Sequence, residues 1–427
     1  MIDIDLIREK PGDVKAGMAK RGIDGAPVDR AHELDERRRE LLVEVETLKA
    51  ERNTVSKEIG QMKDKAAREE KIAAMRKVGD QIDALDGELA EVDDELNGIM
   101  ATIPNIPFEQ VKAGGEEDNE VVKHWGDKPA FDFEPKPHWD LGPELGIIDF
   151  EQGVKVTGSR FYVLSGPGAR LQRALIAWML DLHIRQGYVE KYTPFIVKEE
   201  TVFAAGQLPK FRENLYRDAE EDLYLVPTAE VPLTGIHMDD ILEEDSLPRR
   251  YTAYSPSFRR EKMSAGRDVR GIKRGHQFDK VEMYKYTTPE QGEAEFEQMV
   301  ADAEATCQAL GLPYRLLLKA AGDTSESAHI SYDIEVWAAG CQEWLEVSSI
   351  SLVGDYQARR AGIRYRPTEG KGTRFVYTIN GSGLGLPRTL IAVLENNQQA
   401  DGSVLIPEIL KPWMGGVDII RPEDTHA

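Results

Sequence analysis

The stretch FRREKMSAGRDVRGIKRGHQF, residues 258–278, is the most basic part of an acidic chain. It sets seven cations against Glu261 and Asp268, whereas all 427 residues together have a formal net charge of −22. The cations are Arg259, Arg260, Lys262, Arg267, Arg270, Lys273 and Arg274. Crowded like charges repel, so such a cluster commonly binds anions from outside, such as phosphates, carboxylates or nucleic acid. A solvated loop whose charges keep the chain soluble explains the composition equally well.

The segments on both sides of this stretch are predicted to be strands. RYTAYS (250–255) precedes it and KVEMYKYT (280–287) follows, and both alternate with period two. Similar runs are FYVL (161–164), WLEVSSISLV (344–353) and FVYTIN (375–380). Many strands with few helices between them favour an antiparallel sheet over a doubly wound parallel one. Because no GxGxxG follows a strand and no GxxxxGK[ST] occurs, a bound nucleotide is not expected in a Rossmann or Walker loop.

Residues 28–100 predict a long helical hairpin. They lack proline and are rich in Glu, Lys, Arg and Leu, a composition typical of long helices. Apolar residues recur in steps of four and three along two seams, which the polar stretch KDKAAREEK (63–71) separates. The first seam is Leu41, Val45, Leu48, Arg52, Val55, Ile59 and Met62; the second is Met75, Val78, Ile82, Leu85, Leu89, Val92, Leu96 and Ile99. Two such helices fold back as an antiparallel arm about 50 Å long.

Charge is uneven along this arm. Residues 49–77, around the tip, carry nine cations against five carboxylates, whereas residues 80–95 carry eight carboxylates and no cation. A phosphate backbone would therefore be attracted to the tip and repelled from the base of the second helix. A coiled coil used for dimerisation or as a scaffold is the alternative that this pattern leaves open.

Other features mainly exclude functions. Cys307 and Cys341 are far apart and show no CxxC or Cys/His spacing, so neither a disulfide framework nor a zinc site is expected. No apolar run approaches the roughly 18 residues that a membrane span needs. The N-terminus MIDIDLIREKPGD is acidic and lacks the apolar core of a signal peptide. We therefore expect a cytoplasmic protein without membrane contact.

Three segments, in chain order, resemble the signature motifs of class II aminoacyl-tRNA synthetases. Helix 168–188 with Pro194 resembles the first motif, which forms the dimer interface in that class. The strand, basic loop and strand around residues 258–283 resemble the second. GSGLGLPRTLIAVLENNQ (381–398), a glycine-rich strand end that continues into a helix, resembles the third and carries Arg388. Three motifs in the right order are far more specific than any one of them.

Within that class the chain is similar to seryl-tRNA synthetases of the bacterial type along its whole length. The matching segments are LVPTAEVPLT (225–234), FRRE (258–261), HQFDKVEM (276–283), LEVSSIS (345–351) and NGSG (380–383), together with the helical hairpin. Pro387 is a local departure, because the family often has a small residue or glycine there. Arg388 beside it is retained.

The resemblance implies an α+β architecture in three parts. Residues 1–103 would form a tRNA-binding arm, an antiparallel coiled coil. Residues 104–140 would be a linker and the entry to the catalytic domain, with TIPNIPFEQVKAGGEEDNE (102–120) exposed. Residues 141–427 would be a catalytic domain built on an antiparallel sheet with flanking helices.

The resemblance also implies a two-step reaction. Serine and ATP form seryl-adenylate and pyrophosphate, and the seryl group then passes to the 3′-terminal ribose of tRNA(Ser). Whether tRNA(Sec) is also charged stays open. By the family's pattern the catalytic residues are Arg259, Glu261 and Arg388. Those that contact ATP are Arg259, Arg260, Glu261, Arg274, Phe278, Glu346, Val347, Ser348, Ser349 and Arg388. Outside this context each would more simply be a surface salt bridge or a core aromatic residue.

The family's pattern likewise assigns the serine and metal sites. Thr228, Ala229, Glu230, Arg259, Glu282 and Ser382 would bind serine. Glu346 and Ser349 would hold Mg²⁺ between phosphates, since this hard cation prefers oxygen ligands. The 262–274 loop would meet the triphosphate and the acceptor end of tRNA.

Two further expectations concern assembly and alternatives. The helix at 168–188 carries an apolar stripe that indicates a homodimer: Leu171, Leu175, Ile176, Met179 and Leu182. A related ligase that loads an amino acid onto a carrier protein would lack the hairpin. A non-catalytic RNA-binding or coiled-coil paralogue would have lost at least one of the site residues Arg259, Glu261, Glu282, Glu346 and Arg388.

Overall fold

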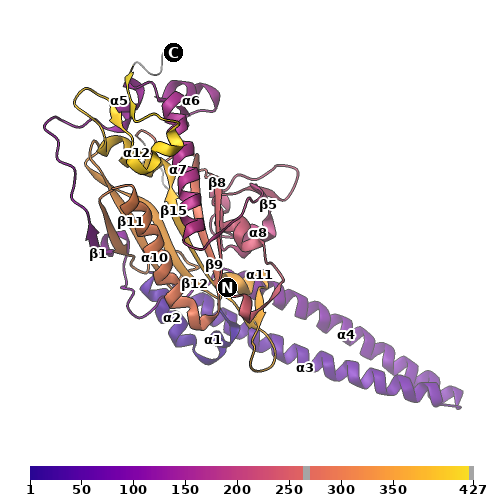
Figure 1. Ribbon diagram of the computed structural model, residues 1–427. Coiled ribbons are helices and arrows are strands. Elements are labelled where there is room, and N and C mark those ends of the chain that lie inside the picture. Colours follow the sequence, from indigo (N-terminus) through magenta and orange to yellow (C-terminus); the bar gives the residue numbers. More distant parts are fainter. Residues whose placement is uncertain (263–269, 423–427) are drawn as a thin grey trace. The chain divides into compact units, whose positions relative to one another are not determined.

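The computed structural model describes residues 1–262 and 270–422 (Figure 1). The chain divides into two compact units, Met1–Pro104 and Asn105–Ala427. In the described residues, no helix combines the length and the apolar character needed to cross a membrane.

The first unit consists of helices α1 (Ile4–Glu9), α2 (Pro11–Lys20), α3 (Ala26–Gln61) and α4 (Lys65–Met100). The last two form the predicted antiparallel hairpin, each 36 residues long. Their connection, residues 62–64, is shorter than the predicted polar separator at 63–71. The reason is local, because the Asp64 side chain accepts hydrogen bonds from the N–H groups of Ala66 and Ala67 and so caps α4 at Lys65.

Both predicted seams face the partner helix. Every seam residue, including Arg52, is buried or half-buried, while the residues between them are mostly exposed. Buried seam positions lie toward the base, where Val45 and Ile82 are the outermost. Ion pairs also cross the hairpin: Arg30–Glu95, Arg37–Glu88, Arg38–Asp93 and Lys49–Asp86. The acidic run at 80–95 is thus partly neutralised by α3, which its sequence alone does not reveal.

The second unit is built on an eight-stranded sheet in the order β1-β10-β11-β12-β15-β9-β8-β4. All neighbours are antiparallel except β4 and β8. The strands are β1 (Glu120–Trp125), β4 (Val189–Glu190), β8 (Arg249–Phe258), β9 (Gln277–Thr287), β10 (Tyr314–Leu318), β11 (Ile330–Ala338), β12 (Glu343–Gly354) and β15 (Tyr377–Gly385). The predicted antiparallel sheet is therefore confirmed.

Period-two alternation gives this sheet two different faces. Val281, Met283, Ile350 and Ile379 belong to the main hydrophobic core, together with residues of helices α7 (Gly166–Arg185), α10 (Gly292–Ala309) and α12 (Leu386–Asn396). Figure 1 shows these helices beside the large sheet. Residues one step along the same strands point the other way. These polar residues, Lys280, Glu282, Ser349, Ser351, Asn380 and Ser382, form the floor and surroundings of a cavity.

Shorter elements surround the sheet. The helices are α5 (His138–Glu144), α6 (Phe150–Val156), α8 (Glu199–Ala204), α9 (Glu230–Gly235) and α11 (Tyr356–Ala361). Small sheets are made by β2 (Ile148–Asp149) with β3 (Val163–Leu164), β5 (Ile196–Lys198) with β6 (Leu223–Leu225), β16 (Val404–Leu405) with β17 (Ile419–Ile420), and by β7 (Ile241–Glu243), β13 (Arg364–Arg366) and β14 (Arg374–Phe375).

The segment after the arm is less exposed than its composition indicates. Asn105 is buried, and its side-chain amide donates to the backbone oxygens of Ser327 and Val353. Val111 belongs to the main core, and β1 is an edge strand of the large sheet. Residues 105–125 are therefore an integral part of the second unit.

Candidate active site

A cavity of about 320 Å³ opens on the polar face of the sheet. Its walls come from β9, β12, β15, the first turn of α12 and the residues just after β8, which include the segments that resemble the second and third motifs. Helix α7, which resembles the first motif, contributes no residue to this lining. Of the residues predicted for the site, those that line it are Thr228, Glu230, Arg259, Glu261, Arg274, Phe278, Glu346, Val347, Ser349, Ser382 and Arg388. Residues that are far apart in sequence thus meet in one place.

Arg259 is held by backbone and ring contacts at the end of β8. Its N–H donates to the backbone oxygen of His276 at 2.9 Å, and its Nε donates to that of Pro227 at 3.2 Å. The guanidinium lies 5.0 Å from the centroid of the Phe278 ring. Burial lowers the pKa of Arg259, and four surrounding glutamates oppose this shift. The result is a half-buried cation that is held in place in the cavity wall.

Two buried carboxylates mark one end of the cavity. Glu230 accepts a hydrogen bond from the Gln357 amide at 2.6 Å, and burial together with the negative Glu282 raises its pKa to about 7. Glu282 is fully buried directly behind the wall, where it pairs with Lys280 and accepts from the Thr228 hydroxyl at 3.3 Å. No donor among the described residues meets its Oε1 atom. This end is therefore suited to a ligand that brings positive charge and hydrogen-bond donors.

Glu261 and Arg274 lie on opposite sides of the basic loop and meet at the cavity, with Arg274 Nη1 3.2 Å from Glu261 Oε2. Glu261 has a φ of 49°, in the left-handed region that residues with a side chain seldom adopt. Strained backbone of this kind is concentrated at functional sites. Residues 263–269 between them, with Arg267, lie outside the described residues.

Arg388 is positioned by three groups from two other segments. Its Nε donates to the backbone oxygen of Lys273 at 3.2 Å, and its Nη1 donates to that of Glu346 at 3.0 Å. The Glu346 carboxylate lies 3.7 Å away. Pro387 occupies the first turn of α12, where no intrahelical N–H is needed, which explains why proline is tolerated beside Arg388.

Four predicted residues do not line the cavity. Glu282 lies behind its wall, as described above. Ala229 has no exposed surface and packs in a separate hydrophobic cluster. Arg260 is exposed, and its guanidinium lies near the Tyr216 ring. Ser348 is buried and donates to the backbone oxygen of Ser382 at 2.6 Å, so it supports the floor from behind.

Other wall residues were missed by the sequence analysis. Lys280, Asn380, Gln207 and Ser327 line the cavity, and Gln357 lies behind Glu230. Lys280 could have been found, because it stands two residues before Glu282 on a predicted strand and so shares its face. Gln357 had no such signal, since α11 carries it to Glu230 from a distant part of the chain.

Comparisons with known proteins agree with this geometry. The family model described as "tRNA synthetase class II core domain (G, H, P, S and T)" matches residues 211–397, and "Seryl-tRNA synthetase N-terminal domain" matches residues 1–107. The serine–tRNA ligase of Roseiflexus sp. (strain RS-1) is 62% identical over 422 residues, which are 99% of this chain and 100% of that protein.

Two solved structures are also similar. Seryl-tRNA synthetase from Pyrococcus horikoshii complexed with ATP has a TM-score of 0.93 and 36% identity, covering 99% of this chain and 100% of that one. Cytoplasmic serine-tRNA ligase from Naegleria fowleri in complex with AMP has a TM-score of 0.88 and 32% identity, covering 99% of each chain.

The antiparallel sheet, the cavity that joins the second and third motifs, and the match to the class II core model define a class II aminoacyl-tRNA synthetase, an ATP-dependent ligase. The hairpin and the sequence identity over the full length identify the family within this class. The chain belongs to the seryl-tRNA synthetase family, whose members are serine–tRNA ligases.

Proposed function

We propose that the cavity activates L-serine with ATP to seryl-adenylate and that the seryl group then passes to the 3′-terminal ribose of tRNA(Ser). One observation carries this assignment: two buried carboxylates, Glu230 and Glu282, stand at one end of a cavity whose other residues include Arg259, Arg274 and Arg388. An amino acid brings an ammonium group for the first end. ATP brings the phosphates that the arginines attract.

At the serine end, Glu230 on the cavity wall would contact the ammonium group, and Glu282 adds negative charge from behind the wall, next to Thr228. Burying a carboxylate oxygen without a donor is costly, and a serine donor would satisfy Glu282 Oε1. Thr228 and Ser382 add hydroxyl groups to the same wall. Ser348 supports Ser382 by donating to its backbone oxygen, and Ala229 is buried between Thr228 and Glu230 in the sequence. A buried site built for a hydroxyl rejects an analogue that lacks it, because its own polar groups would stay unpaired.

At the ATP end, Arg259 lies where it can bridge the serine carboxylate and the α-phosphate. The carboxylate oxygen bonds to the α-phosphorus, the bond to the β-phosphate oxygen breaks, and pyrophosphate leaves. Arg259 stabilises the charge that builds up on the phosphoryl oxygens, which requires no protein nucleophile. Phe278 offers a face for the adenine ring, Glu261 contacts its amino side, and Arg388 and Arg274 reach the terminal phosphates. Arg260, which does not line the cavity, has no direct contact with ATP in this proposal.

Glu346 and Ser349 fit Mg²⁺. Both supply oxygen donors to the same wall, and the half-exposed Glu346 side chain can turn toward a ligand in the cavity. When bound there, the cation neutralises phosphate charge and orients the triphosphate.

We assign tRNA binding to the hairpin of the first unit and to residues 262–274. At the tip, Lys57, Lys63, Lys65 and Arg68 are exposed and make no ion pair in the described part of the chain. Such cations are available to phosphates. The hairpin also argues against a carrier-protein ligase or a bare interaction module. Because tRNA and ATP are consumed where translation occurs, we place the enzyme in the cytoplasm.

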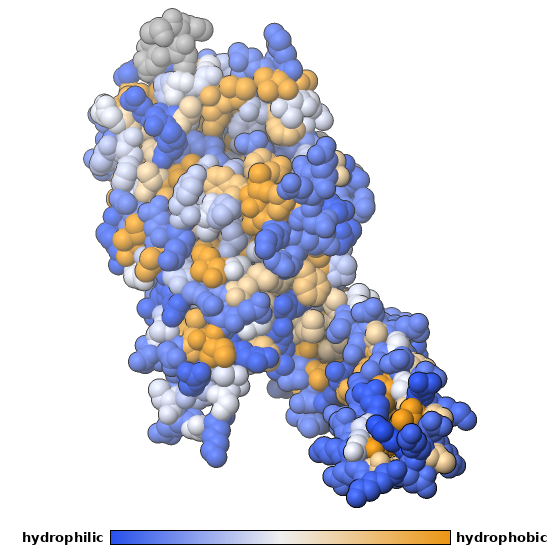
Figure 2. Space-filling view, turned by 90° about the vertical axis from the view of Figure 1, so that its right-hand side faces the viewer, coloured by the Kyte–Doolittle hydropathy of each residue, from blue (hydrophilic) through white to orange (hydrophobic). Residues whose placement is uncertain are grey.

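We also propose a homodimer, but on other residues than the predicted stripe. Leu171, Leu175 and Met179 have no exposed surface within their own unit, so the stripe is mainly an internal core face and that part of the prediction is wrong. Large apolar side chains that remain exposed on this unit include Val154, Val156, Ile184, Val189 and Tyr192. Figure 2 shows hydrophobic patches on one face of the molecule. Val189 also belongs to the edge strand β4, which is open to pairing.

A serine-dependent ATP–pyrophosphate exchange assay tests the assigned reaction. The parental chain should exchange with serine and not with alanine. Arg259→Ala should slow exchange roughly 100-fold or more, because it removes a charged donor to the reacting phosphoryl group. Arg366→Ala is a matched control, since Arg366 is exposed and pairs with Glu243 on the surface. Near-parental exchange by a folded Arg259→Ala variant would contradict the role given to this residue.

A further inference from the structure

Residues 270–274 set the backbone of one cavity wall. Lys273 and Arg274 line the cavity, and the Lys273 backbone oxygen accepts the hydrogen bond from Arg388 Nε at 3.2 Å. Lys273 Nζ pairs with Glu343 at the start of β12. A shift of this short segment would therefore move two wall cations and change the orientation of Arg388.

The first residues of α5 pack against residues 270–272 of this segment. The N–H of Ile272, a fully buried residue, donates to His138 Nε2 at 3.1 Å. The imidazole also packs against Gly271, where an added Cβ would lie 2.0 Å from His138 Nε2. The Trp139 ring lies beneath Arg270, with 4.5 Å between guanidinium and ring centroid. His138 and Trp139 thus fix the position of this segment.

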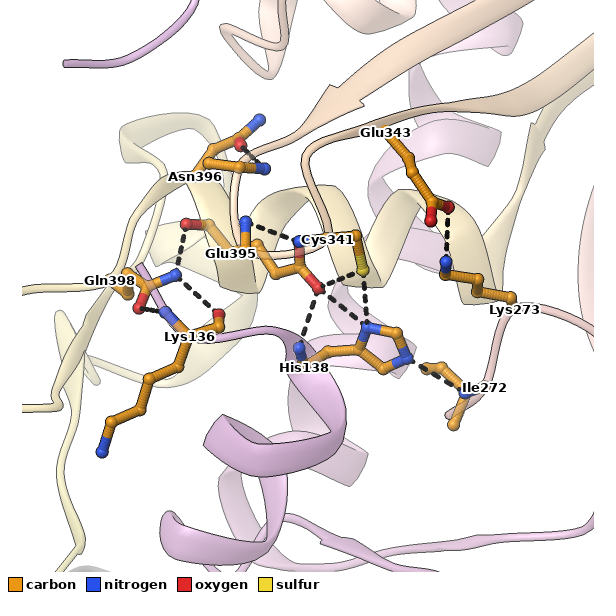
Figure 3. A network of polar contacts seen from close by, with 11 residues as sticks. Lys136, His138, Ile272, Lys273, Cys341, Glu343, Glu395, Asn396 and Gln398 are labelled. Atoms are coloured by element: carbon orange, nitrogen blue, oxygen red, sulfur yellow. Dashed lines mark hydrogen bonds and ion pairs between the residues drawn. The ribbon is translucent and has the colours of Figure 1, made fainter. Parts of the chain in front are cut away.

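His138 is itself fixed by Glu395, near the end of α12 (Figure 3). Both side chains are fully buried. Glu395 Oε1 accepts from the His138 N–H at 2.8 Å, lies 2.8 Å from His138 Nδ1 and accepts from Cys341 Sγ at 3.0 Å. Glu395 Oε2 accepts from the N–H groups of Gly340 and Cys341 at 2.9 and 2.8 Å. One carboxylate therefore joins α5, α12 and the β11–β12 turn.

The hydrogen bonds assign a tautomer and argue against a metal centre. Because the Ile272 N–H donates to Nε2, the neutral ring carries its proton on Nδ1 and donates it to Glu395. His138, Cys341 and Glu395 offer ligand atoms within 4.8 Å of one another. A cation on Nδ1 would displace that proton to Nε2, against the Ile272 N–H, and would compete with the donors that already satisfy Glu395.

We propose that His138 is a positioning residue for the ATP end of the cavity. Through Nε2 it fixes Ile272, and through the adjoining backbone it sets Lys273, Arg274 and the Arg388 guanidinium. Glu395 and Cys341 hold the imidazole in the required orientation. The inference rests on the proposed adenylate-forming reaction, and it adds a residue that none of the three motifs contains.

Two substitutions of His138 test separately its hydrogen bond to Glu395 and its hydrogen bond to Ile272. In His138→Asn the amide takes the place of Nδ1, so the bond to Glu395 is kept and the Ile272 N–H has no acceptor. In His138→Gln the longer side chain places an oxygen near the position of Nε2. We expect His138→Asn to raise the KM for ATP in pyrophosphate exchange roughly tenfold, to leave the KM for serine unchanged, and to be largely rescued in His138→Gln. Cys341→Ser keeps a donor to Glu395 and should match the parental chain.

A measurement without substrates accompanies the kinetics. Amide hydrogen exchange of the peptide that contains Ile272 should be faster in His138→Asn than in His138→Gln, while thermal unfolding temperatures stay similar. An unchanged ATP KM in a folded His138→Asn variant would overturn the proposal. The proposal would also be overturned if the KM values for ATP and serine changed together in both variants, in proportion to their loss of thermal stability. If the parental chain showed no serine-dependent pyrophosphate exchange, the proposed function would be refuted. The amide hydrogen exchange comparison would still test whether His138 fixes Ile272.

Discussion

Glu230 is a residue of the cavity wall whose charge an ordinary change of pH should alter. Burial is the main cause of its raised pKa, about 7, and the neighbouring negative charge of Glu282 adds to it. Below that pH Glu230 is largely neutral and attracts the serine ammonium weakly. Above it the carboxylate is ionised. The KM for serine in pyrophosphate exchange should therefore fall as pH rises through 7, by at most about tenfold per pH unit.

Glu230→Gln supplies the comparison for this pH dependence. The amide keeps an oxygen for the bond from Gln357 but has no charge to titrate. Its KM for serine should be high at every pH, and the slope through 7 should vanish, while the KM for ATP stays close to parental. A parental KM for serine that is flat across this range would contradict the assignment of Glu230 to the ammonium.

Single residues also show how far the sequence could predict the site. Arg259, Glu261, Phe278 and Arg388 lie in short motifs, and all four line the cavity. Arg260 stands between two of them but is exposed outside the cavity, near the Tyr216 ring, because the chain has left β8 here and turns at Glu261. Gln357 and His138 could not be found from local sequence. Their partners, Glu230 and Ile272, lie more than 100 residues away.

Among the elements, helix α7 shows that the sequence of one helix does not predict what its apolar face packs against. Its apolar stripe is real, but sequence periodicity cannot tell whether an apolar face meets its own sheet or a second copy. The large sheet shows the same limit in another way. Period two predicted four of its strands, β8, β9, β12 and β15, and the antiparallel class, whereas the order β1-β10-β11-β12-β15-β9-β8-β4 depends on pairing between distant segments.

The exposed apolar residues at the β4 edge of the large sheet lead to a prediction about the proposed homodimer. Val189 on β4 is 55% exposed and Ile184 near the end of α7 is 42% exposed, so a charge at either costs little in an isolated subunit. In a dimer that buries this edge, Val189→Glu or Ile184→Glu should shift the mass in sedimentation equilibrium from dimer to monomer. Val43→Glu, at a 65% exposed position on α3, is the control and should leave the mass unchanged. A parental chain that is monomeric at micromolar concentration would refute the dimer.

At the scale of the whole molecule, the proposed chemistry and the proposed main tRNA-binding element, the hairpin, belong to different units. The cavity residues all belong to Asn105–Ala427, and the hairpin belongs to Met1–Pro104. Composition and heptad periodicity were enough to predict the hairpin, since its contacts are largely between two neighbouring helices. The ion pairs Arg37–Glu88 and Lys49–Asp86 were not predicted, because the register of the helices is fixed by the short turn at 62–64.

The separation predicts that the outer hairpin can be removed while serine activation is kept. Replacing residues 46–81 with a short turn keeps Val45 and Ile82, the outermost buried seam residues, and leaves the base intact, including the Arg8–Asp35 pair. Pyrophosphate exchange should stay near parental, because no cavity residue lies in this segment. Aminoacylation should collapse, since A-form RNA is recognised largely through phosphates, hydroxyl groups and shape.

Charge substitutions test the same assignment without shortening the hairpin. Neutralising Lys57, Lys63, Lys65 and Arg68 should weaken tRNA binding and flatten its salt dependence, by about 0.9 in the log–log slope for each phosphate that is no longer neutralised. Asp80, Asp83, Glu91 and Asp94 form the matched control. They belong to the acidic run but make no ion pair within the described residues, so neutralising them should leave binding unchanged or slightly stronger. A hairpin-deleted chain that still charges tRNA at the parental rate would show that the arm is a structural coiled coil, and tRNA binding would then have to lie within the second unit.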